Sequence, residues 1–115
     1  MNFSTFERGD IVLIELPFSD YSASKTRPVL VVSSPKFNSG SRDLIVAKIT
    51  GTEYKSDYVV ELDKGGLSQG KLKKKSYIDA GFLFTVEKSL VERRIAKVTD
   101  AVLSEVLLRI GWILQ

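Results

Sequence analysis

The alternation of apolar and polar residues predicts a series of short β-strands followed by one helix. Apolar and β-branched residues form nearly continuous runs at residues 11–16, 29–33 and 44–50, which are lengths typical of strands. Further strands are expected at residues 58–62, 76–78, 82–86 and 95–98, with a turn at 35–42 and one helical turn at 87–91. The pattern therefore predicts a mainly β protein.

The last part of the chain has a different period. Its apolar residues recur at helical spacing and form one broad face. They are Val102, Leu103, Val106, Leu107, Ile110, Ile113 and Leu114. A side-chain oxygen of Thr99 or Asp100 can accept from a backbone N–H of the first turn. Because six or seven short strands do not stay flat and open, we expect a compact barrel with one amphipathic C-terminal helix packed on it.

Composition excludes several kinds of site. The chain has 115 residues, enough for one domain (1–115), and it contains neither cysteine nor histidine. Disulfides, thiolate metal sites, a nucleophilic thiol and an imidazole base are therefore excluded. No apolar run approaches the roughly 18 residues of a membrane span, and the start of the chain does not resemble a signal peptide. We expect a cytoplasmic protein without membrane contact.

Two basic features favour an anionic partner. Lys71, Lys73, Lys74 and Lys75 lie within five positions, and the net charge is +3. Such a run indicates either a nucleic-acid contact or a solvated surface. Arg27 precedes a proline, which restricts the arginine backbone to extended conformations. A cation fixed at a strand edge in this way suits a phosphate, although an arginine that simply ends a strand fits equally well.

Six segments, taken in order and spacing, resemble the MazF/PemK family of growth-inhibiting toxins over nearly the whole chain. They are residues 9–12 (GDIV), 25–33 (KTRPVLVVS), 44–50 (LIVAKIT), 65–67 (GGL), 75–78 (KSYI) and 83–90 (LFTVEKSL). The resemblance implies a small SH3-like barrel with a C-terminal helix, and a homodimer. It also implies the toxin component of a type II toxin–antitoxin system. Such a toxin is a metal-independent endoribonuclease without a cofactor that cleaves single-stranded mRNA at specific sequences. A cognate antitoxin restrains it, and DNA is contacted only through the antitoxin complex.

The resemblance gives Arg27 and Thr50 as catalytic residues. Expected RNA contacts are Ser19, Lys25, Thr26, Gly51, Lys73, Lys74, Lys75 and Ser76. Asp79 and Gly81 stand where some relatives carry an arginine and an acid, so the general base stays open among Asp79, Asp20 and Glu53. Loop aromatics expected to stack on bases are Phe18, Tyr21 and Tyr54.

Cleavage without metal or histidine can use the neighbouring 2′-hydroxyl as nucleophile and leave a 2′,3′-cyclic phosphate. A guanidinium offers a planar fork of donors to the phosphoryl oxygens, which suits Arg27. The Thr50 hydroxyl can donate to the same phosphate, and its β-branch restricts it to few rotamers. The alternative that remains is a non-catalytic SH3-like barrel that binds nucleic acid or protein, since a fold alone does not decide function.

Overall fold

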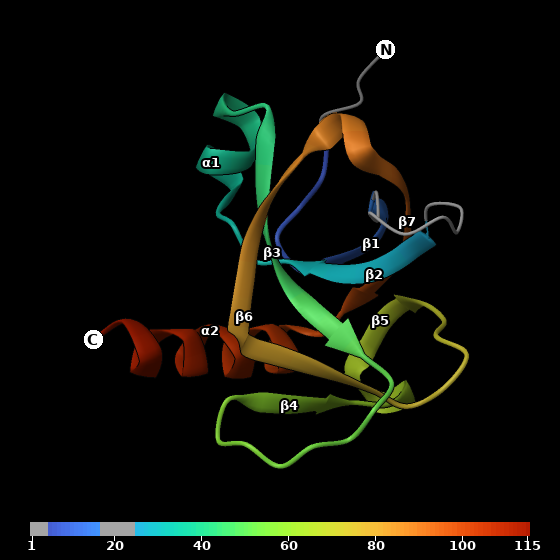
Figure 1. The fold of residues 1–115 in the computed structure, drawn as a ribbon, viewed down its shortest axis with the longest axis vertical. Helices are drawn as coiled ribbons and strands as arrows, with labels where there is room; N and C mark the ends of the chain where they lie inside the picture. Colours follow the sequence, from blue (N-terminus) through green and yellow to red (C-terminus); the bar gives the residue numbers. More distant parts are fainter. Residues whose placement is uncertain (1–4, 17–24) are drawn as a thin grey trace.

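A computed structural model describes residues 5–16 and 25–115. Seven strands and one long helix make up most of it (Figure 1). The strands are β1 (Asp10–Leu16), β2 (Lys25–Val31), β3 (Asp43–Thr50), β4 (Val59–Leu62), β5 (Leu67–Gly70), β6 (Ser76–Glu87) and β7 (Val91–Val98). The helices are α1 (Pro35–Gly40), the 3₁₀ turns η1 (Lys64–Gly66) and η2 (Lys88–Leu90), and α2 (Asp100–Leu114). The predicted mainly β architecture with a C-terminal helix is confirmed.

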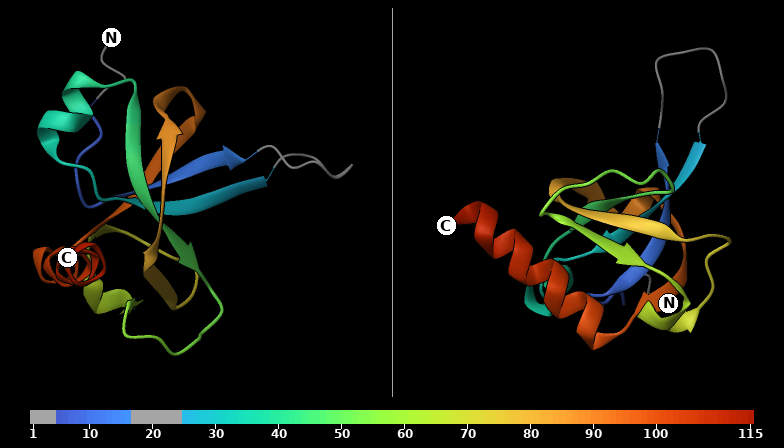
Figure 2. Two further views of the ribbon diagram at one scale, coloured as in Figure 1. Left: turned by 60° about the vertical axis from the view of Figure 1, so that its left-hand side comes forward. Right: turned by 90° about the horizontal axis from the view of Figure 1, so that it is seen from below.

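The seven strands form one antiparallel sheet in the order β4-β6-β3-β2-β1-β7-β5. The sheet curls so strongly that it makes a half-open barrel, and α2 lies across one side of it (Figures 1 and 2). Strand β1 pairs with β2 from Ile11 opposite Leu30 to Leu16 opposite Lys25. Strand β2 pairs with β3 over a much shorter stretch, beginning at Val29 opposite Lys48.

Several predicted boundaries were wrong. Strand β2 begins at Lys25 rather than residue 29, because pairing with β1 extends through its polar first half. Segments 76–78 and 82–86 belong to the single strand β6, and β7 begins at Val91 rather than residue 95. Strand β5 lies where only a glycine and lysine loop was expected, since pairing with β7 holds a segment with little apolar character.

The predicted turn at 35–42 is instead the short helix α1. Ser34 caps it, because its hydroxyl accepts from the backbone N–H of Phe37 at 3.1 Å, and Pro35 occupies the first turn. The side chain of Asn38 is buried and donates to the carbonyl of Ser33 at 3.0 Å. Local capping and one buried amide therefore outweigh the turn propensity of this segment.

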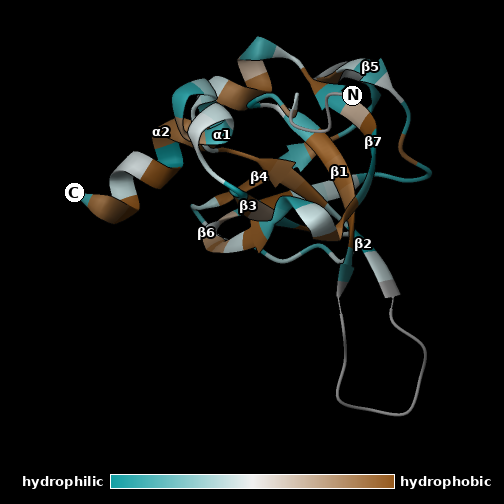
Figure 3. Ribbon diagram, turned by 90° about the horizontal axis from the view of Figure 1, so that it is seen from above, coloured by the Kyte–Doolittle hydropathy of each residue, from teal (hydrophilic) through white to brown (hydrophobic). Residues whose placement is uncertain are grey.

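The apolar residues divide between the two faces of the curled sheet. The larger cluster, which includes Ile11, Leu30 and Ile78, packs against α2 through the fully buried Val106. The smaller cluster lies on the opposite face and includes Val29 and Val46. Figure 3 shows hydrophobic colouring on several strands, β1 among them, and on α2. Both faces of the curled sheet are therefore packed with apolar side chains.

Helix α2 begins as predicted, because the Thr99 hydroxyl accepts from the backbone N–H of Val102 at 3.2 Å. Its C-terminal part extends past the sheet (Figures 1 and 2). Trp112 is 49% exposed there and Leu114 is 74% exposed, so apolar side chains of this helix face solvent. No helix among residues 5–16 and 25–115 is long and apolar enough to span a membrane.

Candidate nucleic-acid interface

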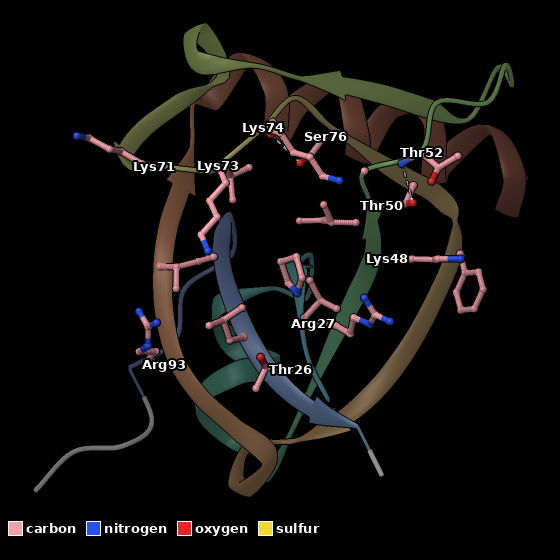
Figure 4. A pocket seen from close by; sticks show the side chains of 18 of the residues that line it. Thr26, Arg27, Lys48, Thr50, Thr52, Lys71, Lys73, Lys74, Ser76 and Arg93 are labelled. Carbon is pink, nitrogen blue, oxygen red and sulfur yellow. Dashed lines mark hydrogen bonds between the residues drawn. The ribbon is translucent and has the colours of Figure 1, made fainter. Parts of the chain in front are cut away.

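A cavity of about 1300 Å³ opens where β2 separates from β3 (Figure 4). Its lining residues come from five strands, from the loop between β5 and β6, and from Gly51 and Thr52 in the loop after β3. Six of them are basic: Arg27, Lys48, Lys71, Lys73, Lys74 and Arg93. No aspartate or glutamate is found in this lining among the residues that the structure describes. The cavity is therefore a cationic hollow suited to a polyanion.

Arg27 and Thr50, expected from the sequence as the catalytic pair, both line this cavity. Arg27 lies two positions before Val29 on the same face of β2, and Thr50 lies two positions after Lys48, which is opposite Val29 on β3. Arg27 has no ion pair with any acidic residue of the described ranges. Its guanidinium is exposed and its donors are available to an anion.

The Thr50 hydroxyl is oriented by the backbone that follows it. Its oxygen accepts from the backbone N–H of Thr52 at 3.1 Å, drawn as a dashed line in Figure 4. The hydroxyl keeps its own proton, which it can donate to a further acceptor. A Cβ on the intervening Gly51 would lie 2.5 Å from Cε of Lys74. The Lys74 side chain thus packs directly over Gly51, which has no side chain to block it. This contact brings the Lys74 ammonium close to the residue that follows Thr50.

The lysine run divides between the cavity and the outer surface. Lys71, Lys73 and Lys74 line the cavity, as do Thr26 and Ser76. Lys75 does not. Its ammonium lies 2.8 Å from a carboxylate oxygen of Glu61 on β4, and this hydrogen bond and the adjacent negative charge raise the pKa of Lys75. The structure therefore does not bring Lys75 to the other predicted RNA contacts.

Gly70 sets the path of this loop. Its φ of +78° is favourable only for glycine, and a Cβ there would lie 2.2 Å from the carbonyl oxygen of Ile95. The close approach joins β5 to β7 immediately before Lys71. The loop that carries the lysines therefore leaves the sheet at a fixed point. Of the remaining predicted contacts, Ser19 lies outside the described residues, and Lys25 is described only as the first backbone position of β2.

Among the charged and aromatic lining residues, sequence reasoning missed Lys48, Phe82, Phe84 and Arg93. Strand alternation could have identified Lys48, because it lies two positions before Thr50 on the same face of β3. Strand alternation also directs the neighbouring residues Arg93 and Arg94 of β7 to opposite faces. Arg94 pairs with the buried carboxylate of Asp10 at 3.0 Å, whereas Arg93 lines the cavity.

The acids proposed as general base do not line the cavity. Asp79 accepts from the backbone N–H of Gly81 at 2.9 Å through one oxygen and from the Tyr54 hydroxyl through the other. Burial, together with the Asp79 carboxylate, raises the pKa of Tyr54 to about 12. Glu53 is exposed outside the lining, and Asp20 lies outside the described residues. Phe18 and Tyr21 also lie outside them, and Tyr54 contacts Asp79 rather than the cavity.

Solved structures of similar fold cover nearly the whole chain. An endoribonuclease in complex with its cognate antitoxin, from Mycobacterial species, is 18% identical with a TM-score of 0.75 and covers 96% of this chain and 95% of that one. MazE-MazF from Deinococcus radiodurans is 20% identical with a TM-score of 0.77 and covers 94% of each chain. Mycobacterium tuberculosis toxin MazF-mt6 is 20% identical with a TM-score of 0.73 and covers 91% and 95%. These likenesses confirm the predicted small barrel fold.

Sequence comparison supplies the family. A search of curated proteins gives no match. A sequence profile of the PemK-like, MazF-like toxins matches residues 7–114, which is nearly the entire chain and includes every described residue of the cavity. The chain therefore belongs to the PemK-like, MazF-like toxin family of type II toxin–antitoxin systems.

Proposed function

We propose that the chain is an endoribonuclease that cleaves single-stranded RNA in the cationic cavity. One observation carries this proposal: Arg27 and Thr50 line the same hollow, and every charged residue in its described lining is basic. Solved relatives of the same fold are described as endoribonucleases, which supports the same activity. Growth inhibition then follows from cleavage of mRNA.

In the proposed reaction, the 2′-oxygen of a ribose attacks the adjoining phosphorus and the bond to the 5′-oxygen breaks. The 2′-hydroxyl loses its proton and the leaving 5′-oxygen takes one up, so that the net reaction moves one proton between these two oxygens. The products are a 2′,3′-cyclic phosphate and a 5′-hydroxyl. Arg27 stabilises the negative charge that grows on the phosphoryl oxygens, and Thr50 donates a hydrogen bond to one of them. No group of three or more acidic residues in the described part of the chain is arranged to hold a metal ion. We therefore expect that chelation leaves cleavage unchanged.

We further propose two protein partners. An acidic segment of a cognate antitoxin fits the same cavity by charge, and the structures named MazE-MazF are of such pairs. DNA would then be contacted only through that complex. A second copy of this chain is the proposed occupant of the exposed apolar end of α2, since Leu108, Trp112, Ile113 and Leu114 gather there.

The test is cleavage of a long, weakly structured RNA in excess chelator, with the new 5′ ends mapped. Arg27→Ala should lower the cleavage rate at least about a hundredfold, because the charge that stabilises the transition state is lost. Arg27→Lys should remain impaired, because a point charge does not reproduce the fork. Thr50→Ala should give a smaller but measurable loss. Arg42→Ala removes an exposed arginine outside the cavity and serves as the matched control.

An Arg27→Ala protein that cleaves as fast as the native chain would refute the assignment. One observation favours the alternative of a non-catalytic binding module: no carboxylate lines the described cavity to act as a base. That alternative predicts that the native chain binds RNA and leaves it intact. Mapping of the ends therefore separates the two functions directly.

A further inference from the structure

Phe82 is a large aromatic residue that the core does not use. Its side chain is 48% exposed although it lies in the middle of β6, and it lines the cavity. Ala80, two positions earlier on the same strand, is buried. The half-exposed phenyl ring therefore offers apolar surface to a ligand inside the cationic cavity.

Two contacts orient the ring. The Phe84 ring lies 6.0 Å away, centroid to centroid, at an interplanar angle of 78°, which is an edge-to-face arrangement. Phe84 itself packs against the smaller core cluster, so this contact is anchored in the protein interior. The Lys48 ammonium lies 4.8 Å from the centroid of the Phe82 ring, as a cation–π contact. The ring is therefore held in place before any ligand binds.

The backbone of β6 explains why this ring is exposed. Pairing with β3 shifts from Ala47 opposite Leu83 to Lys48 opposite Asp79, so residues 80–82 have no partner on β3. Bulges of this kind redirect side chains and are frequent beside functional sites. Here the bulge ends at Phe82 and lies across from the segment of β3 that leads to Thr50.

Lys48 connects the ring to the phosphate site. It lies two positions before Thr50 on the same face of β3, and it is opposite Val29, two positions after Arg27 on β2. In the view of Figure 4, the Lys48 side chain leaves β3 at a level between Thr50 and Arg27 and points away from the middle of the cavity. Its ammonium reaches the Phe82 ring. A nucleotide whose phosphate contacts Arg27 therefore has an aromatic ring and a further cation beside it.

We propose that Phe82 is a stacking platform for an unpaired base of single-stranded RNA, with Lys48 contacting the phosphate that adjoins this base. Only single strands expose base faces to an aromatic side chain, and such stacking tolerates any base. The proposal depends on the proposed function for the choice of RNA as ligand, and it adds the residue that positions the nucleotide.

The test is equilibrium binding of labelled oligonucleotides of about twelve nucleotides, a length within the usual site sizes for single strands. Two probes are 2′-O-methyl oligouridylate and oligoadenylate, whose blocked hydroxyl prevents cleavage. The third has the same phosphates but carries abasic sites. Phe82→Leu should weaken binding of the first two at least about fivefold and leave binding of the third unchanged.

Two further variants isolate stacking from folding. Phe82→Trp should retain affinity for the base-bearing probes. Its indole emission should be quenched by these probes only, and this emission is measured in a background in which the sole native tryptophan is replaced (Trp112→Phe). Phe37→Leu is the matched control, since Phe37 is 37% exposed on α1, outside the cavity. It should change nothing.

Native affinity in Phe82→Leu, or an equal loss for the abasic probe, would overturn the stacking proposal. These results are independent of cleavage. Suppose that the native chain cuts no RNA, and that Phe82→Leu weakens binding of the base-bearing probes only. This result would refute the proposed function and support the stacking proposal. If the native chain cuts RNA and Phe82→Leu cleaves and binds RNA as well as the native chain does, the stacking proposal is refuted and the proposed function is supported.

Discussion

The salt dependence of nucleic-acid binding offers a quantitative test of the cavity. Each cation that contacts a phosphate of a single strand displaces counterions and contributes about 0.7 to the slope of log affinity against log salt. The six basic residues of the lining therefore predict a slope of about −4 if all of them contact phosphates. Between about 50 and 200 mM salt, the affinity should then fall about 300-fold.

Replacing Lys71, Lys73 and Lys74 together by alanine removes three of these six cations. We expect the slope to drop to about −2, so the same salt interval should cost only about 20-fold in affinity. The measurement is fluorescence anisotropy of a labelled 2′-O-methyl oligonucleotide across a salt series, at constant pH and temperature. Circular dichroism of the variant establishes that the fold is retained.

A matched triple variant distinguishes local contacts from net charge. Lys36, Lys55 and Lys64 are exposed, and none of them lines the cavity. Their replacement by alanine removes the same charge and should leave the slope near its native value. Lys75→Ala should also have little effect, because Lys75 pairs with Glu61. Equal slopes in the two triple variants would show that the loop lysines act only through net charge, and the proposed binding surface would be wrong.

Two further predictions concern the protein itself. Burial and Asp79 raise the pKa of Tyr54 to about 12 in the folded chain. Above about pH 10 the unfolded chain loses this proton while the folded chain keeps it, so the free energy of unfolding should fall between about pH 10 and 12. Tyrosinate absorbance should show a step near pH 12 that Tyr54→Phe removes and Tyr58→Phe retains. Sedimentation at micromolar concentration should show a dimer, and Trp112→Glu should dissociate it. The control Phe37→Glu changes an exposed residue of α1 and should leave the dimer intact. A monomeric native chain would refute the proposed dimer.

Much of the fold could be predicted from the sequence because burial imposes a period. The run at β1 is apolar on both faces, since the curled sheet packs a core cluster on each side. The helical period of α2 could be predicted in the same way, and of the two caps that the sequence offered, Thr99 and Asp100, the structure has Thr99. Strand β5 and the first half of β2 were not, because pairing partners distant in the sequence hold these polar segments extended. The local pattern of apolar and polar residues does not indicate which distant segments will pair.

The site was predicted less completely than the fold. Arg27 and Thr50 could be selected through a family resemblance, and both line the cavity. Lys48, Phe82 and Arg93 lie on strands far apart in the sequence, so their convergence depends on the curl of the sheet. The role of Lys75 depends on Glu61, which only the β4–β6 pairing brings close. A run of like charges therefore did not reveal which of its members share a surface.

The origin of the cavity lies in a mismatch between two strand pairings. Strand β2 pairs with β1 from Lys25 to Leu30, but it pairs with β3 only from Val29 onward. Pro28 stands at that point, and a proline has no N–H to continue the ladder toward β3. The first half of β2 is thus attached to one neighbour only, and the space left beside β3 is the hollow that Arg27 and Thr50 line. The dipeptide Arg27–Pro28 accordingly has two physical effects, since the proline opens the sheet and the arginine supplies the charge at the opening.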